Sequence, residues 1–100
     1  MRKAVTKFLE NKEQEGKGKA WNRMLRRDLT DFANWCSTRL VTPANVNTLA
    51  LEEYRKTWKG APGTRSRRQA RLSLFSSYCV DHDWMRQNFV QKMSKIKVPD

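Results

Sequence analysis

The chain has 100 residues, which is enough for one domain with a single hydrophobic core. Hydrophobic residues make up 38% of it and aromatic residues 10%, which argues against disorder, and no apolar run is long enough to span a membrane. The 21 lysines and arginines outnumber the 10 acids, so the net charge is +11. This excess predicts an anionic partner, above all a nucleic acid.

Two amphipathic helices are expected in the first part of the chain. Apolar residues recur at helical spacing from Lys3 to Glu15, and Gly16 and Gly18 then end the segment. A second, longer helix is expected from Lys19 to Arg39, because its apolar positions return every three or four residues. Its arginines, by contrast, fall largely off that apolar stripe: Arg23, Arg26 and Arg27.

The second part of the chain predicts a short helix, a long helix and a final helical segment. The expected ranges are 48–59, 64–82 and 86–95. Thr48 is expected to cap the first of these helices and Thr64 the second. Trp84 and Met85 are expected to turn back onto the core. The predicted fold is therefore all-α, a compact bundle of four to five helices over residues 1–97, with residues 98–100 beginning a linker.

The stretch GAPGTRSRRQAR, residues 60–71, brings a cluster of arginines to the start of the fourth helix. A helix N-terminus carries partial positive charge, so cations there cost stability unless an anion is bound nearby. Free N–H groups at such an end are a natural phosphate site. Because no acid lies between Glu53 and Asp81, we expect this end of the helix to contact DNA. Arg68 lies on the apolar stripe, and for it we expect snorkelling or pairing with an acid instead.

In an antiparallel-like bundle, the N-terminal ends of the second and fourth helices are expected to lie side by side. Their guanidinium groups would then share one surface, suited to phosphate and to guanine edges in the major groove. The expected DNA-binding residues are Lys19, Arg23, Met24, Arg26, Arg27, Gly63, Thr64, Arg65, Arg67 and Arg71. A solvated charged face remains the alternative for any single arginine.

The fourth helix also carries a family pattern, T-x-x-R-R-x-x-x-L-x-x-F-x-x-Y, at Thr64, Arg67, Arg68, Leu72, Phe75 and Tyr78. With the preceding segments AVTKFLENKEQ, WNRMLRRDLTDFANWC and LEEYRKTW, the chain resembles the core-binding, SAM-like domain of phage-integrase-type tyrosine recombinases. It departs from the family at Gly18-Lys19-Ala20-Trp21, where a Ser-Pro-x-Thr entry is usual, and at Phe89, where a proline usually follows Asn88.

The resemblance implies that the second and fourth helices enter the major groove, while a catalytic domain outside this chain clamps the duplex from the other side. Groove-facing positions would be Arg23, Met24, Arg27, Gly63, Arg67 and Arg71. It further implies partnership with that catalytic domain and with other recombinase protomers, and no chemistry by these residues alone. No cofactor or membrane is expected, and the expected location is the cytoplasm of a bacterial or phage-infected cell, with no signal peptide visible.

Other functions have weaker support in the sequence. Cys79, His82 and the flanking aspartates lack the four ligands of a structural zinc site, so no metal is expected. Tyr54 and Tyr78 lie on apolar stripes, which does not suit a nucleophile. The main rival is a helical protein-interaction module whose basic surface meets an acidic partner. An enzyme in its own right would need a pocket of converging titratable groups, and a membrane-surface helix conflicts with the apolar faces that the core needs.

Overall fold

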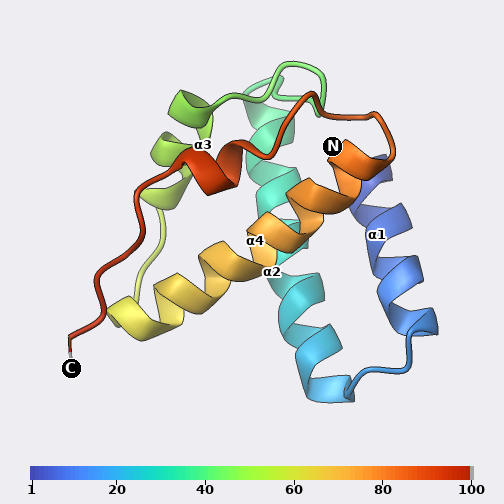
Figure 1. The fold of residues 1–100 in the computed structure, drawn as a ribbon, viewed down its shortest axis with the longest axis horizontal. Helices are drawn as coiled ribbons and strands as arrows, with labels where there is room; N and C mark the ends of the chain where they lie inside the picture. The colour runs from blue at the N-terminus through green and yellow to red at the C-terminus, as the bar shows by residue number, and fades with distance from the viewer. Residues whose placement is uncertain (100) are drawn as a thin grey trace.

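The computed structural model describes residues 1–99 and contains four α-helices and one short 3₁₀ helix (Figure 1). In chain order these are α1 (Arg2–Gln14), α2 (Lys19–Thr38), α3 (Thr48–Arg55), α4 (Pro62–Asp81) and η1 (Phe89–Lys92). The predicted all-α bundle is confirmed, and residues 1–99 contain no strand. The first two helices begin and end within one residue of the sequence prediction.

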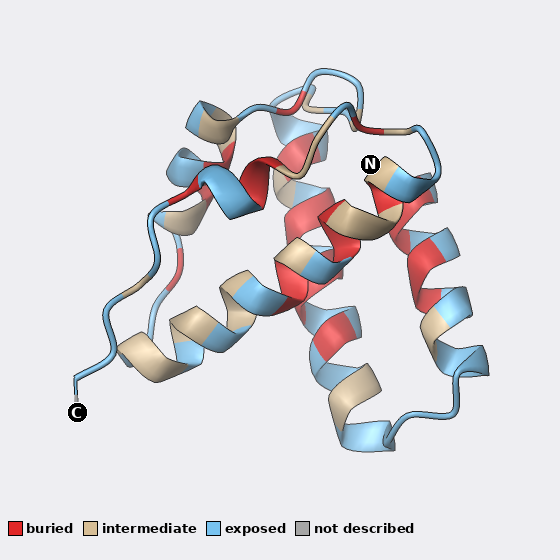
Figure 2. Cartoon of the chain, viewed as in Figure 1, coloured by how far each residue is buried: buried red, intermediate tan, exposed pale blue. Residues whose placement is uncertain are grey.

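One core joins α1, α2 and α4. The first two helices run antiparallel, and α4 crosses in front of α2 (Figure 1). Buried residues occupy the faces on which these helices meet, as Figure 2 shows. Phe75 of α4 packs edge-on against Phe8 of α1 and Phe32 of α2, and Tyr54 of α3 adds its ring to Phe32. The aromatic residues are therefore mainly part of the core.

The short helix α3 differs from its prediction at both ends. Its N-cap is Asn47 and not Thr48, because the Asn47 side chain accepts a hydrogen bond from the Ala50 N–H at 2.9 Å. The helix ends at Arg55, four residues before the predicted Lys59. There the backbone tightens into i→i−3 bonds, and the Thr57 hydroxyl donates to the Tyr54 carbonyl at 2.7 Å. That side chain satisfies a carbonyl at the helix end and stops the helix.

The long helix α4 begins two residues earlier than predicted. Pro62 occupies its first turn, where the N–H that a proline lacks would have no intrahelical partner in any case. Thr64 is therefore inside the helix, and the N-cap is Ala61, whose side chain makes no capping hydrogen bond. At the other end, His82 is the C-cap.

The predicted final helix over residues 86–95 is wrong, because only Phe89–Lys92 is helical, as a single 3₁₀ turn. The Asn88 amide explains the difference: its oxygen accepts from the N–H groups of Val90 and Gln91. Its nitrogen donates to Ser73 and Ser77 of α4. These bonds start the turn at Asn88 and tie it to α4.

After Met93 the chain is extended and held along α3 and α4. The Arg55 guanidinium donates to the Ser94 carbonyl at 2.7 Å, and the Gln69 amide donates to the same oxygen at 3.3 Å. The chain then passes the start of α4, because a Cβ added at Gly63 would lie 3.9 Å from a methyl carbon of Val98. The predicted linker over residues 98–100 begins at this place, and Asp100 lies outside the described residues.

Both cysteines are fully buried, Cys36 in α2 and Cys79 in α4. Burial raises the pKa of each thiol to about 12, since the thiolate would lose its hydration. At neutral pH both thiols are therefore protonated, which suits core residues and not nucleophiles.

Replacing Leu40 by glycine is expected to stabilise the protein by roughly 0.5–1 kcal/mol. Leu40 follows α2 with a φ of 57° and is 82% exposed, so it bears left-handed strain without burying its side chain. The Val41 N–H bonds to the Cys36 carbonyl at 2.9 Å, as in the helix ending that favours glycine at this position. Urea unfolding measures the change. Leu40→Ala is the control, because alanine keeps the Cβ and should gain little; equal gains for both variants would contradict the strain explanation.

Candidate nucleic-acid interface

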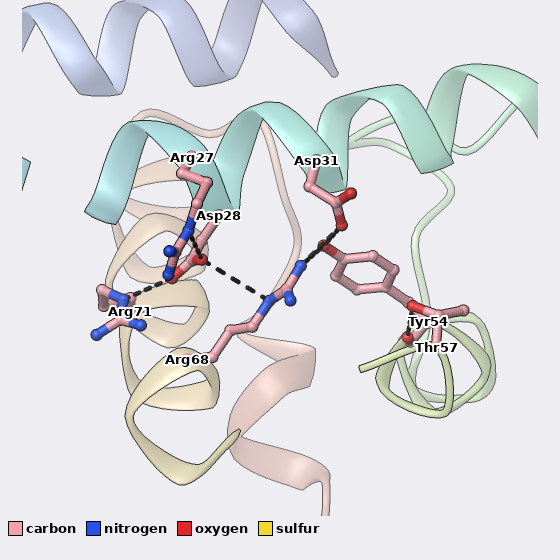
Figure 3. Close-up of polar contacts among 7 residues, drawn as sticks. All are labelled: Arg27, Asp28, Asp31, Tyr54, Thr57, Arg68 and Arg71. Atoms are coloured by element: carbon pink, nitrogen blue, oxygen red, sulfur yellow. Dashed lines mark hydrogen bonds and ion pairs between the residues drawn. The ribbon is translucent and has the colours of Figure 1, made fainter. Parts of the chain in front are cut away.

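A buried ion pair fixes the crossing of α2 and α4. The Arg71 Nε of α4 donates to the Asp28 carboxylate of α2 at 2.6 Å, and the two residues are 7% and 5% exposed (Figure 3). Arg27 and Arg68 approach the other oxygen of the same carboxylate at 3.5 Å and 4.0 Å. One carboxylate thus faces three guanidinium groups, which leaves this junction with excess positive charge.

A second set of polar contacts extends this junction to α3. Arg68 donates to Asp31 of α2 at 2.7 Å and to the Tyr54 hydroxyl at 2.8 Å, while that hydroxyl donates to Asp31 at 2.6 Å (Figure 3). The expectation that Arg68 pairs with an acid is confirmed. Burial, with a smaller contribution from Asp31, raises the pKa of Tyr54 above its ordinary value, so its phenol stays protonated and serves packing and hydrogen bonding.

From this crossing the N-terminal halves of α2 and α4 diverge (Figure 1). We call the starts of these two halves the basic fork: residues 19–27 of α2 and 62–67 of α4. Met24 lies one turn before Asp28 in α2, and Arg67 lies one turn before Arg71 in α4. Both are therefore on the side of their own helix that faces the other helix at the crossing. The prediction that the two helix starts lie side by side is wrong, because the helices touch at their middles and the starts splay apart.

Most predicted contact residues reach solvent in the basic fork. Seven are exposed: Lys19, Arg23, Met24, Arg26, Arg27, Thr64 and Arg67. Gly63 and Arg65 are half-buried. Arg26 turns toward α1 and pairs with Glu13, but both side chains are more than half exposed, and an exposed pair contributes less than about 1 kcal/mol. Phosphate can therefore compete with Glu13 for this arginine.

Arg71 is the predicted contact residue that the structure removes from the surface. Its side chain is only 8% exposed and is held by Asp28, so it joins the two arms of the fork and does not project from them. The reason is its position on α4: Arg71 borders the buried Leu72 and Phe75 on the core-facing side. A guanidinium there needs an internal partner.

Neither arm of the fork has its helix start closed by a side chain. The N-cap residues are Gly18 in α2 and Ala61 in α4, neither of which makes a side-chain capping bond, and neither first turn contains an acid. The first N–H groups of α2, and those of Gly63 and Thr64 after Pro62 in α4, therefore remain for an external acceptor, and the helix dipoles add partial positive charge there.

Asp28 is the residue of this site that the sequence analysis missed. The sequence does indicate that Asp28 is buried, because it lies on the apolar stripe of α2 beside Leu25, Leu29 and Phe32. A carboxylate at such a position is buried only when it is paired. Arg71, beside the core stripe of α4, was the available partner.

In residues 1–99, no group of three or more histidine, cysteine or acidic side chains gathers where it could hold a metal ion. Over the same residues, no helix has both the length and the apolar character needed to cross a membrane.

Comparison with known proteins found no matching family model, no matching curated protein and no matching solved structure.

Proposed function

We propose that this protein binds duplex DNA through the basic fork, as the non-catalytic core-binding domain of a tyrosine recombinase or phage integrase acting in DNA integration and recombination. One observation carries the proposal. The fork presents six exposed or half-buried cations, while of the two acids paired with it Asp28 is buried against Arg71 and only Glu13, the partner of Arg26, is exposed. The six are Lys19, Arg23, Arg26, Arg27, Arg65 and Arg67.

The shape of the fork suits a duplex better than a flat charged surface would. A single α-helix fits the major groove of B-DNA, and arginines on its flank reach phosphates or guanine edges. Two diverging helix starts meet the polyanion at two places, each with free N–H groups and a favourable dipole. The buried Asp28–Arg71 pair holds the two arms at a fixed relative orientation.

The path of the C-terminal segment also supports the proposal. A Cβ at Gly63 would lie 3.8 Å from the Arg67 guanidinium and 3.9 Å from Val98, so the chain passes the tip of the fork. A catalytic domain attached after this segment would emerge beside the bound duplex, which is what a two-domain clamp around DNA requires. In this proposal the chain itself performs no chemistry, and its partners are duplex DNA, that catalytic domain and other recombinase protomers.

Removing two arginines from the fork is expected to weaken duplex binding by about 10- to 100-fold at 0.1 M salt. The reason is that each lost phosphate contact lowers the magnitude of the slope of log K against log salt concentration by about 0.9. The variant is Arg23→Gln/Arg67→Gln, with one substitution in each arm, and the probe is a labelled duplex titrated at several salt concentrations. The slope of log K against log salt should fall in magnitude by about 1.8.

The matched control is Arg39→Gln/Arg86→Gln, which removes the same charge from exposed arginines just beyond the opposite ends of α2 and α4. It should bind within about threefold of the unmodified protein, since only long-range attraction changes. Equal losses for the two double variants would refute the fork as the binding face. A salt-independent affinity of the unmodified protein would refute duplex binding through phosphates altogether.

A further inference from the structure

A groove beside the loop that follows α2, at the opposite end of that helix from the fork, combines an apolar floor with a basic edge. It is about 450 Å³ in volume and lies between the start of α1, the loop after α2 and Trp84. The residues that line it are Met1, Lys3, Ala4, Lys7, Thr42, Pro43, Ala44 and Trp84. This groove does not depend on the duplex-binding proposal, because it shares no residue with the basic fork.

Two of the segments that line the groove are held by contacts within the protein. Trp84 packs edge-on against Tyr78 and beside His82, and its backbone N–H bonds to the Cys79 carbonyl at 2.8 Å. The opposite wall is held by Asn45, whose side chain accepts from the Thr42 N–H at 2.7 Å and donates to the Leu40 carbonyl at 3.1 Å. A ligand would therefore find the surface already formed, which reduces the entropy cost of binding.

Charge along the groove has one sign. Lys3 and Lys7 are four residues apart on one face of α1, both are exposed, and neither forms an ion pair with another residue in the range 1–99. No acidic side chain lines the groove. An adjoining hollow, which shares Ala44 and Trp84 with the groove, is lined by one acid and one arginine, Asp83 and Arg86. The groove itself thus offers apolar contact next to two unpaired cations.

We infer that this groove docks an acidic, amphipathic peptide segment of a partner protein, with a bulky apolar side chain on the floor and flanking carboxylates on Lys3 and Lys7. Tryptophan is among the residue types that dominate binding energy at protein interfaces. Charge complementarity selects the acidic peptide, because a duplex has no protruding bulky apolar group to fill the floor and a basic peptide would be repelled by the lysines. The chain would then hold DNA on one side and a regulatory or architectural partner on the other.

The experiment selects random twelve-residue peptides displayed on phage against the whole chain at physiological salt. Enriched peptides are expected to contain a bulky apolar residue and two or more acids. Lys3→Glu/Lys7→Glu should weaken their binding by about tenfold or more, because charge reversal turns two attractions into repulsions. Ala44→Glu, which puts a carboxylate on an exposed wall residue of the groove, should do the same.

Lys92→Glu/Lys95→Glu is the matched control, with the same charge change at exposed lysines outside the groove, and should keep peptide affinity within about threefold. The inference is overturned if no peptide is enriched, if enriched peptides lack acids, or if Ala44→Glu leaves their binding unchanged. It is also overturned if the chain dimerises and Ala44→Glu abolishes the dimer, since the occupant is then a second copy. Duplex affinity, measured in parallel, should be equal for the two lysine double variants.

Discussion

Replacing Asp28 by alanine is expected to lower the free energy of unfolding by about 3–5 kcal/mol, because it leaves a buried guanidinium without its counter-charge. Arg71 is 7% exposed and has Asp28 as its ion-pair partner within residues 1–99. A domain of this size has a total stability of about 5–15 kcal/mol, so the variant would be close to unfolding at 37 °C. Urea unfolding followed by tryptophan fluorescence measures the loss.

Two companion variants separate the buried pair from charge effects in general. Asp31→Ala removes a carboxylate that is 58% exposed, and its cost should stay at about 1–2 kcal/mol. Asp28→Leu/Arg71→Met removes both buried charges and should recover most of the stability lost in Asp28→Ala. If Asp28→Ala and Asp31→Ala cost the same, the Asp28–Arg71 pair does not carry the crossing of the two helices.

The double variant Asp28→Leu/Arg71→Met also tests whether Arg71 is absent from the DNA-binding face. Its net charge equals that of the unmodified protein, so long-range attraction for DNA is unchanged. If Arg71 makes no phosphate contact, the folded double variant should retain the salt slope of duplex binding. A slope shallower by about 0.9 would return Arg71 to the binding face.

Helical spacing predicted the long elements well, for a physical reason. In α2, Leu25, Leu29 and Phe32 recur at the period of the helix, and burying that stripe is the main source of stability for an amphipathic helix. The same holds for Leu72, Phe75 and Cys79 in α4. Such patterns involve residues that are close in the sequence, so they can be recognised without knowing the packed structure.

The places where prediction failed depend on contacts between distant residues. Asn88 was expected inside a helix, but its side chain bonds to Ser73 and Ser77 of α4 and limits the helix to one 3₁₀ turn. Arg71 was expected on the surface, but its partner lies 43 residues away in α2. Helical phase tells which side of α4 carries Arg71, and only the packed structure tells what lies opposite.

For the candidate site, too, the sequence predicted the features that depend on local patterns and missed those that depend on distant contacts. Exposure of Arg23, Arg27 and Arg67 follows from their place off the apolar stripes, and the structure agrees. The divergence of the two helix starts does not follow from any local pattern, because it depends on where α4 crosses α2. That crossing is set by the Asp28–Arg71 pair together with the packing of Phe32 and Phe75.

Replacing Phe75 by alanine is expected to cost about 3–5 kcal/mol of unfolding free energy, comparable to the loss of Asp28. Phe75 is 0% exposed, and its ring centroid lies 5.5 Å from that of Phe8 and 6.3 Å from that of Phe32. The substitution therefore removes contacts to α1 and α2 at once and leaves a cavity where the three helices meet. Thermal and urea unfolding of the variant give the measurement.

Two neighbouring substitutions decide whether the cost comes from this three-helix contact. Phe75→Leu keeps most of the buried volume and should cost about 1.5 kcal/mol or less. Leu74→Ala truncates the adjacent side chain, which is 48% exposed, and should cost less than about 1 kcal/mol. If Phe75→Ala were no worse than Leu74→Ala, α4 would not be anchored through Phe75. The orientation of the basic fork would then rest on the Asp28–Arg71 pair alone, and Asp28→Ala should abolish duplex binding even under conditions where the helices persist.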